Sequence, residues 1–143
     1  MSGGITVTWL SDYIGRPWRE DAEGPAAYDC KGLVRAVQAR VWSRAVPALL
    51  GVDRLTDWAA VRASAALDGW RPVQAVPVEG DILVVRGKDG AHVGTFVTVR
   101  RSLQVLHSHS FIKGGRQLGR VRLTPLPELL AGGYSRPEVW RCA

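Results

Sequence analysis

The clearest pattern of hydrophobic and polar positions runs over residues 30–44. Apolar side chains recur there at helical spacing, at Cys30, Leu33, Val34, Val37 and Val41. Asp29 stands immediately before this run, where its carboxylate can accept hydrogen bonds from the first helical turn. The pattern therefore predicts a helix with Cys30 at its N-terminus, on the face turned toward the core.

Other helical and β-type patterns lie on both sides of this helix. A short helix is predicted over residues 8–14, a turn-rich stretch over 15–27, and a second packed helix over 56–67. After Trp70, β-branched runs broken by glycine indicate antiparallel strands near residues 81–86, 92–99, 103–109, 120–123 and 138–142, with a short helix near 127–130. Helices first and a meandering sheet afterwards predict an α+β fold with separate helical and sheet layers.

Length and composition favour one compact domain over residues 1–143, because 143 residues with 46% hydrophobic content suit a single core. No apolar run approaches the roughly 18 residues needed to cross a bilayer, and the first residues lack the basic and apolar regions of a signal peptide. We therefore expect cytoplasmic synthesis without a signal peptide and no membrane insertion.

The chain is basic, with 19 Lys and Arg against 13 Asp and Glu and a formal charge of +6. Such a charge attracts polyanions, which include nucleic acid, anionic cell-wall polymers and acidic peptides. The basic residues are scattered and do not form a run. This spacing favours a solvated surface, and we expect no nucleic-acid partner.

The two cysteines, Cys30 and Cys142, are too few for a disulfide scaffold, although a single pair between them is an open alternative. A helix N-terminus carries partial positive charge and unpaired N–H groups, which favour a thiolate at Cys30. The same N–H groups could hold the oxyanion of a tetrahedral intermediate. Taken alone, a cysteine on an apolar helix face is more often a small core residue.

A candidate base lies on a predicted strand downstream. Side chains alternate along a strand, and a hairpin turning at Arg100-Arg101 would set His109 opposite His92 and His107 diagonally across, all on one face. The chain thus offers a thiol, a base and an orienting group, as nucleophilic catalysis by cysteine requires. His107 is the predicted orienting group, with His109 and then Gln104 as alternatives.

Four sequence blocks resemble the NlpC/P60 family of cysteine peptidases. Tyr28-Asp29-Cys30-Lys31-Gly32-Leu33-Val34 looks like its Phe-Asp-Cys-Ser-Gly-Leu-Val nucleophile motif. The family's Gly-Asp-Leu and His-Val-Gly-Ile-Tyr blocks, the second of which carries the base, are similar to Gly80-Asp81-Ile82-Leu83 and Ala91-His92-Val93-Gly94-Thr95-Phe96-Val97. The block with the orienting residue is similar to Leu103-Gln104-Val105-Leu106-His107-Ser108. Upstream, Ile14-Gly15-Arg16-Pro17-Trp18 resembles its Gly-Thr-Pro-Tyr segment. The similarity spans residues 13–110, and the joint order of the blocks is more specific than any one of them.

The resemblance implies a papain-like α+β domain whose nucleophile helix packs on an antiparallel sheet. It implies a Cys30, His92 and His107 site that cleaves amide bonds of peptidoglycan stem peptides, without a cofactor or metal. The Arg-Pro-aromatic lead-in and the Cys-X-Gly-Leu-Val-Arg helix look most like the phage tail-assembly branch. Phage tail proteins are then expected partners, with the protein carried in a virion or delivered to the cell wall.

Three departures from the family pattern concern the substrate. Lys31 replaces the Ser that in the family helps to hold a free peptide amine, and its positive charge would repel an amine and favour a carboxylate. Trp18 stands where many members have a Tyr near the oxyanion, and Glu20-Asp21 replaces paired glycines. The residues expected to contact substrate are Tyr13, Trp18, Asp29 and Lys31, although Asp29 is better explained as a helix cap.

Two other chemical readings stay open. The protein could be an inactive member of the fold that was kept for phage tail assembly. A zinc ion could instead bind where Cys30, His92, His107 and His109 meet, although no Cys-x-x-Cys or His-Glu-x-x-His spacing supports a metal site.

Overall fold

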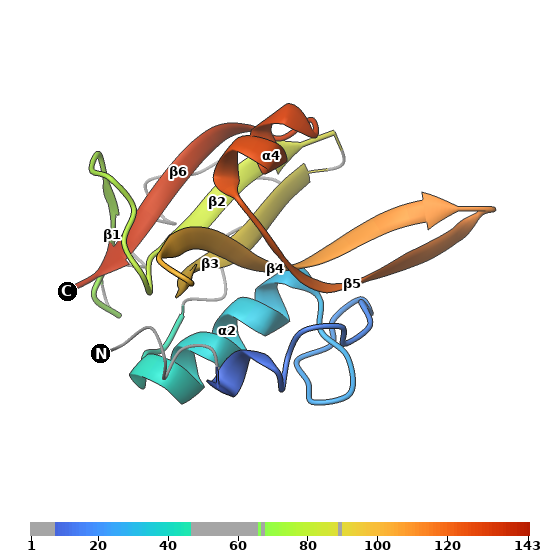
Figure 1. Ribbon diagram of the computed structural model, residues 1–143, viewed down its shortest axis with the longest axis horizontal. Helices are drawn as coiled ribbons and strands as arrows, with labels where there is room; N and C mark the ends of the chain where they lie inside the picture. The colour runs from blue at the N-terminus through green and yellow to red at the C-terminus, as the bar shows by residue number, and fades with distance from the viewer. Residues whose placement is uncertain (1–7, 47–65, 67, 89) are drawn as a thin grey trace.

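The computed structural model describes residues 8–46, 66, 68–88 and 90–143, and these form an α+β fold built on one six-stranded antiparallel sheet (Figure 1). The strand order is β1-β6-β2-β3-β4-β5. The strands are β1 (Trp70–Val73), β2 (Ile82–Gly87), β3 (Gly90–Val99), β4 (Ser102–Lys113), β5 (Arg116–Thr124) and β6 (Ser135–Cys142), and the helices are α2 (Cys30–Trp42) and α4 (Leu126–Ala131). The expected α+β class is confirmed.

The two helices cover opposite faces of the sheet. Leu33 and Val37 of α2 pack with Val97, Leu106 and Val121 in one core cluster. On the other face, Leu129 of α4 packs with a second set of strand residues, Leu83, Val85, Phe96 and Val105. Because neighbouring residues of a strand point to opposite faces, the nearly continuous apolar run of β2 is buried on both sides.

The five predicted strands are present, but their ends differ from the sequence pattern. β4 continues to Lys113 and β5 begins at Arg116, around a turn at Gly114-Gly115 in which both residues have positive φ. The polar composition of residues 108–117 concealed this longer hairpin. β1 was not predicted at all, because Trp70–Val73 is too short to show alternation.

The predicted helix over 30–44 is confirmed and ends at Trp42, where Ser43 takes the left-handed conformation of a helix C-cap. The predicted helix over 8–14 is wrong beyond residue 10, because residues 11–15 form a turn. The predicted helix over 56–67 lies, apart from residue 66, outside the described residues. Within the described part of the chain, no helix is long and apolar enough to cross a membrane.

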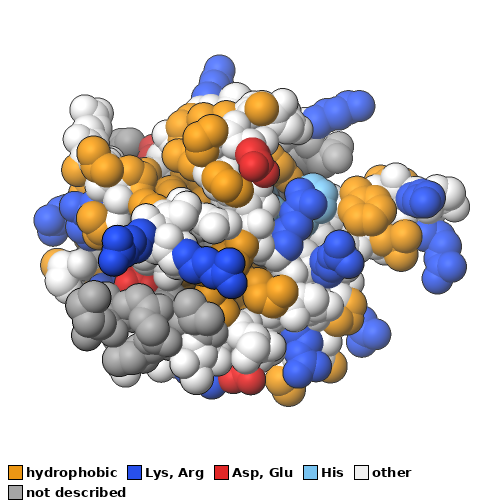
Figure 2. Space-filling model, viewed as in Figure 1, with side chains coloured by type: hydrophobic (Ala, Val, Ile, Leu, Met, Phe, Trp, Pro, Cys, Tyr) orange, Lys and Arg blue, Asp and Glu red, His pale blue; other side chains and the backbone are white. Residues whose placement is uncertain are grey.

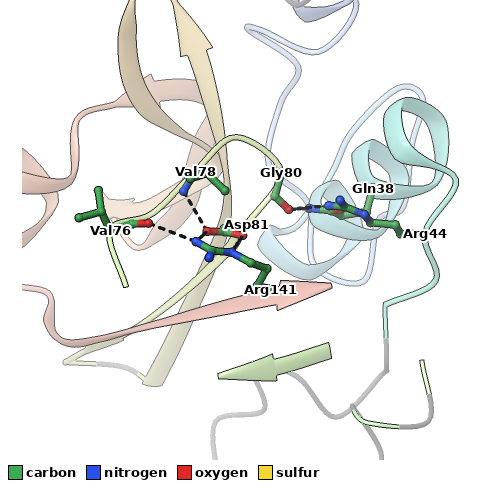
Figure 3. Close-up of polar contacts among 7 residues, drawn as sticks. All are labelled: Gln38, Arg44, Val76, Val78, Gly80, Asp81 and Arg141. Atoms are coloured by element: carbon green, nitrogen blue, oxygen red, sulfur yellow. Dashed lines mark hydrogen bonds and ion pairs between the residues drawn. The ribbon is translucent and has the colours of Figure 1, made fainter. Parts of the chain in front are cut away.

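A set of polar contacts around Gly80-Asp81 ties the start of β2 to α2 and to β6 (Figure 3). Asp81 is buried, and both of its carboxylate oxygens accept hydrogen bonds from the Arg141 guanidinium of β6, at 3.0 and 2.8 Å. The Gly80 carbonyl accepts hydrogen bonds from Gln38 and Arg44, each at 3.0 Å. Asp81 is therefore a structural residue that fixes β2 against β6, and the Gly80 carbonyl fixes the same strand start against α2.

Candidate active site

Three contacts fix the N-terminus of α2, where Cys30 is the first helical residue. Asp29 caps the helix, because its Oδ1 accepts a 2.6 Å hydrogen bond from the Gly32 N–H. Its Oδ2 accepts a second hydrogen bond from the Asp21 N–H at 3.0 Å. The Ser108 hydroxyl of β4 donates a 2.6 Å hydrogen bond to the Tyr28 carbonyl. The segment before Cys30 is therefore held against the sheet beside His107.

The close approach of a loop to α2 explains why a small residue, Gly32, follows Cys30 by two positions. A Cβ at this position would collide with the backbone carbonyl of Ala22, which lies directly against the helix. The loop that carries Asp21 can therefore approach the first turn of α2 only because residue 32 is glycine.

The two predicted histidines lie in one hydrogen-bonded chain. His92 Nε2 is 2.8 Å from His107 Nδ1, and His107 Nε2 is 2.8 Å from the Thr124 hydroxyl of β5. The β3–β4 register pairs Thr95 with Leu106, so its continuation sets His109 opposite His92 and His107 diagonally across, as the Arg100-Arg101 turn predicts. The rings of His92 and His107 meet edge to face, with centroids 4.9 Å apart. His107, and not His109, is therefore the histidine that contacts His92.

Two further residues shape this histidine pair. The Tyr134 ring stacks on His92, with centroids 5.0 Å apart and an interplanar angle of 19°. A Cβ at Gly94 would lie 3.2 Å from the Cβ of His107 and closer still to the Val105 side chain, so glycine allows β3 and β4 to bring the rings together. Tyr134 and Thr124 were missed from the sequence, because each reaches the site only through a distant strand or turn. Ser108 follows His107 in the third motif block, but its hydrogen bond to Tyr28 joins residues 80 positions apart and was missed.

Cys30 and His92 line one cleft of about 600 Å³ at the N-terminus of α2. Three of the four residues expected to contact substrate line the same cleft, namely Trp18, Asp29 and Lys31. The fourth, Tyr13, does not. It is only 4% exposed and packs in the core against Trp9 and Tyr28, because its ring completes the cluster beneath α2.

Lys31 also lines a second cavity of about 280 Å³, whose apolar residues are Val34, Val46, Ile82 and Val93. The two cavities share Asp21, Asp29 and Lys31. Among the described residues, Lys31 has no ion-pair partner. Within this part of the chain, Lys31 is therefore an unpaired cation next to Cys30, and it lines both cavities.

Burial dominates the acidity of Cys30. Removal from water raises the pKa of this thiol, and the nearby Asp29 carboxylate raises it further. The backbone N–H groups of Val93 and Lys31 and the charge of Lys31 lower the pKa, but they do not outweigh burial. The resting Cys30 is therefore a thiol, not the thiolate that its position at a helix end predicts.

Burial also keeps both histidines neutral. It lowers the pKa of His92 to about 4 and that of His107 to about 2, with further lowering by neighbouring charges, including Arg122. No hydrogen bond joins Cys30 to His92, whose Nε2 is engaged by His107. The resting site thus holds a neutral thiol and a neutral imidazole in one cleft.

A metal centre has no support in the described part of the chain, where no group of three His, Cys, Asp or Glu side chains is arranged to hold an ion. Cys30 and Cys142 are both free thiols, so the alternative of a disulfide between them is wrong.

Comparison with known proteins adds no relative to this picture. No protein-family model matches the sequence, and no curated protein matches it either.

Proposed function

We propose that this protein is a cysteine hydrolase of the NlpC/P60 type, with a papain-like arrangement of its α+β domain. The observation that supports it most is the shared cleft, in which Cys30 stands at the head of α2 and His92 is oriented by His107. The order of these residues in the chain matches the family motifs, and Ser108 and Gly94 give physical reasons for two other positions within those motifs.

The hydrogen-bonded chain suggests how the base works. If His92 donates its Nε2–H to His107 Nδ1, and His107 donates its Nε2–H to Thr124, then His92 Nδ1 keeps a lone pair. His107 suits this part because its lowered pKa keeps it neutral and able to accept a hydrogen bond. His92 Nδ1 is then the atom that takes the thiol proton.

Hydrolysis proceeds through an acyl-enzyme. Cys30 Sγ bonds to the scissile carbonyl carbon as its proton passes to His92, and the carbonyl electrons move to the oxygen. The Cys30 N–H at the helix end stabilises this oxyanion, since the Asp29 cap uses the Gly32 N–H instead. The C–N bond then breaks, His92 returns the proton to the leaving amine, and water hydrolyses the thioester.

The proposed substrates are stem peptides of bacterial peptidoglycan, in which a carboxylate near the scissile bond would pair with Lys31. Glu20, Asp21 and Asp29 line the same cleft, so such a carboxylate must lie on the Lys31 side. Lys31 supplies a positive charge beside Cys30 and lines both cavities, of which only the larger is also lined by Cys30. Phage tail association, with delivery to the cell wall, belongs to the same proposal and rests on the sequence resemblance alone.

Activity on purified peptidoglycan and synthetic stem peptides tests the proposal. We expect the wild-type protein to release cleavage products detectable by chromatography, and Cys30→Ala to lose at least about 10³-fold in rate because no nucleophile is left. Cys142→Ala is the matched control, since Cys142 is also a partly buried free thiol but lies at the end of β6. It should keep wild-type activity.

The competing candidate is an inactive phage tail assembly protein with the same fold. The raised pKa of Cys30 and the lack of a hydrogen bond to His92 favour it. Equal rates for wild type and Cys30→Ala, or no cleavage by folded wild-type protein, would support assembly and reject the hydrolase.

A further inference from the structure

β4 and β5 continue past the rest of the sheet as a projecting hairpin, which we call the arm and define as residues 109–120 (Figure 1). The arm exposes large apolar side chains. Phe111 is 47% exposed and Leu118 is 39% exposed, and the strand register pairs them directly, so both lie on one face. Ile112 is 71% exposed and points to the opposite face of the arm, because successive strand residues alternate. Paired exposed hydrophobic residues such as Phe111 and Leu118 mark a binding surface more often than isolated ones do.

The arm is purely cationic. No Asp or Glu occurs anywhere over residues 90–127, whereas the arm itself carries Lys113, Arg116 and Arg120. None of these three cations forms an ion pair within the part of the chain that the structure describes. In Figure 2 the visible side of the arm shows hydrophobic and Lys or Arg side chains together. The arm therefore attracts negative charge without neutralising itself.

A row of rings connects the arm to the candidate base. His92 contacts His107, His107 contacts His109 at 6.0 Å between centroids, and His109 contacts Phe111, also at 6.0 Å. Phe111 and His109 line the same cleft as Cys30. His109 Nδ1 is buried there without a hydrogen-bond partner among the described residues, although buried nitrogens are normally paired. A ligand that lies in this cleft could supply the missing partner.

We propose that the arm is a binding site for the polymer beyond the scissile bond, an anionic peptidoglycan strand that runs from Cys30 past His109 onto Phe111 and the basic tip. This inference rests on the proposed function. Continuity with the cleft favours an extended polymer over a folded partner, because one ligand must reach both the thiol and the arm. The cations select its negative charge, and the apolar pair supplies contact area for sugar rings or peptide.

Binding to intact peptidoglycan sacculi tests the arm, with Cys30→Ala as the parent so that the polymer is not digested. Lys113→Ser with Arg116→Ser removes the two cations that pair across the tip of the arm. We expect roughly tenfold weaker binding, measured by co-sedimentation, and a smaller decrease in binding as salt is added. The matched control is Arg100→Ser with Arg101→Ser, which removes the same charge from the β3–β4 turn at the opposite end of β3 from His92. It should bind like the parent.

Three results would overturn the inference: no binding of sacculi by the parent, no loss in the tip variant, or an equal loss in tip and control variants. The ratio of activity on sacculi to activity on a short stem peptide, measured with Cys30 restored, should fall roughly tenfold in the tip variant alone. If neither substrate is cleaved but binding still depends on the arm, the hydrolase proposal fails and the polymer site stands.

Discussion

Cys30 is subject to opposing influences within one turn of helix. Its thiol lies at a helix end beside Lys31, which favours the anion, yet burial and Asp29 favour the neutral form and prevail. The lowered pKa of His92 acts in the same direction, because an imidazolium is disfavoured in the same cleft. In the proposed mechanism, Cys30 is therefore expected to give up its proton during attack, without a preformed ion pair.

Alkylation of Cys30 measures this balance directly. We expect iodoacetamide to react slowly at neutral pH and faster as pH rises above the ordinary thiol pKa of about 8.5, because burial raises the pKa of Cys30. Mass spectrometry of the peptide that contains Cys30 gives the rate. A rate that levels off below pH 7 would instead reveal a stable thiolate. The His92→Ala variant is the control, and it should keep the same slow reaction at neutral pH.

The β3–β4 hairpin turns at an unfavourable pair of residues. Arg100 and Arg101 have φ of 50° and 64°, and the Val99 and Ser102 pair closes the loop on both sides. Two-residue hairpin loops with positive φ favour Asn-Gly, because a side chain in the left-handed region costs about 1 kcal/mol. This hairpin nevertheless sets the register that brings His107 to His92.

Replacing Arg100 with Asn and Arg101 with Gly should raise the free energy of unfolding by about 1 kcal/mol, because the new residues suit the turn. Urea denaturation followed by tryptophan fluorescence measures the change. Arg100→Ser with Arg101→Ser removes the same charge without relieving the backbone, and it should give little gain. If both variants gain equally, charge repulsion and not backbone conformation limits this turn.

Of the three histidines in the molecule, two are buried in the neutral state, at 8% and 0% exposure for His92 and His107, and burial also lowers the pKa of His109. In the unfolded chain a histidine binds a proton below about pH 6.5. Below that pH the unfolded state binds more protons than the folded state, so stability is complete above pH 6.5 and declines as pH falls toward the folded pKa of His92, about 4.

We therefore expect the free energy of unfolding to decrease by roughly 2–3 kcal/mol between pH 7 and pH 4.5 from His92 alone, with a further decrease from His107. Urea denaturation at a series of pH values measures it. The His92→Gln variant should show a shallower decrease, because it lacks one titrating group. A stability that is constant from pH 7 to 4.5 would mean that the two rings are not buried as neutral groups.

The sequence by itself determined the α+β class, helix α2 with its Asp29 cap, the positions of five strands, and Cys30, His92 and His107 as candidates. These are local signals, since spacing of apolar residues and side-chain alternation act within one element. The same local signals could not reveal the four-residue strand β1 or the extended arm, whose strands are stabilised by pairing with distant segments.

Only the tertiary structure decided the environment of the site. Whether a thiol at a helix end is ionised depends on how much water the surrounding strands exclude, which gives Cys30 a raised pKa despite its favourable position. The contacts of Thr124, Tyr134 and Ser108, and the place of Tyr13 in the core, likewise depend on segments far apart in the chain. Burial and long-range contact belong to the folded molecule, and no short stretch of sequence encodes them.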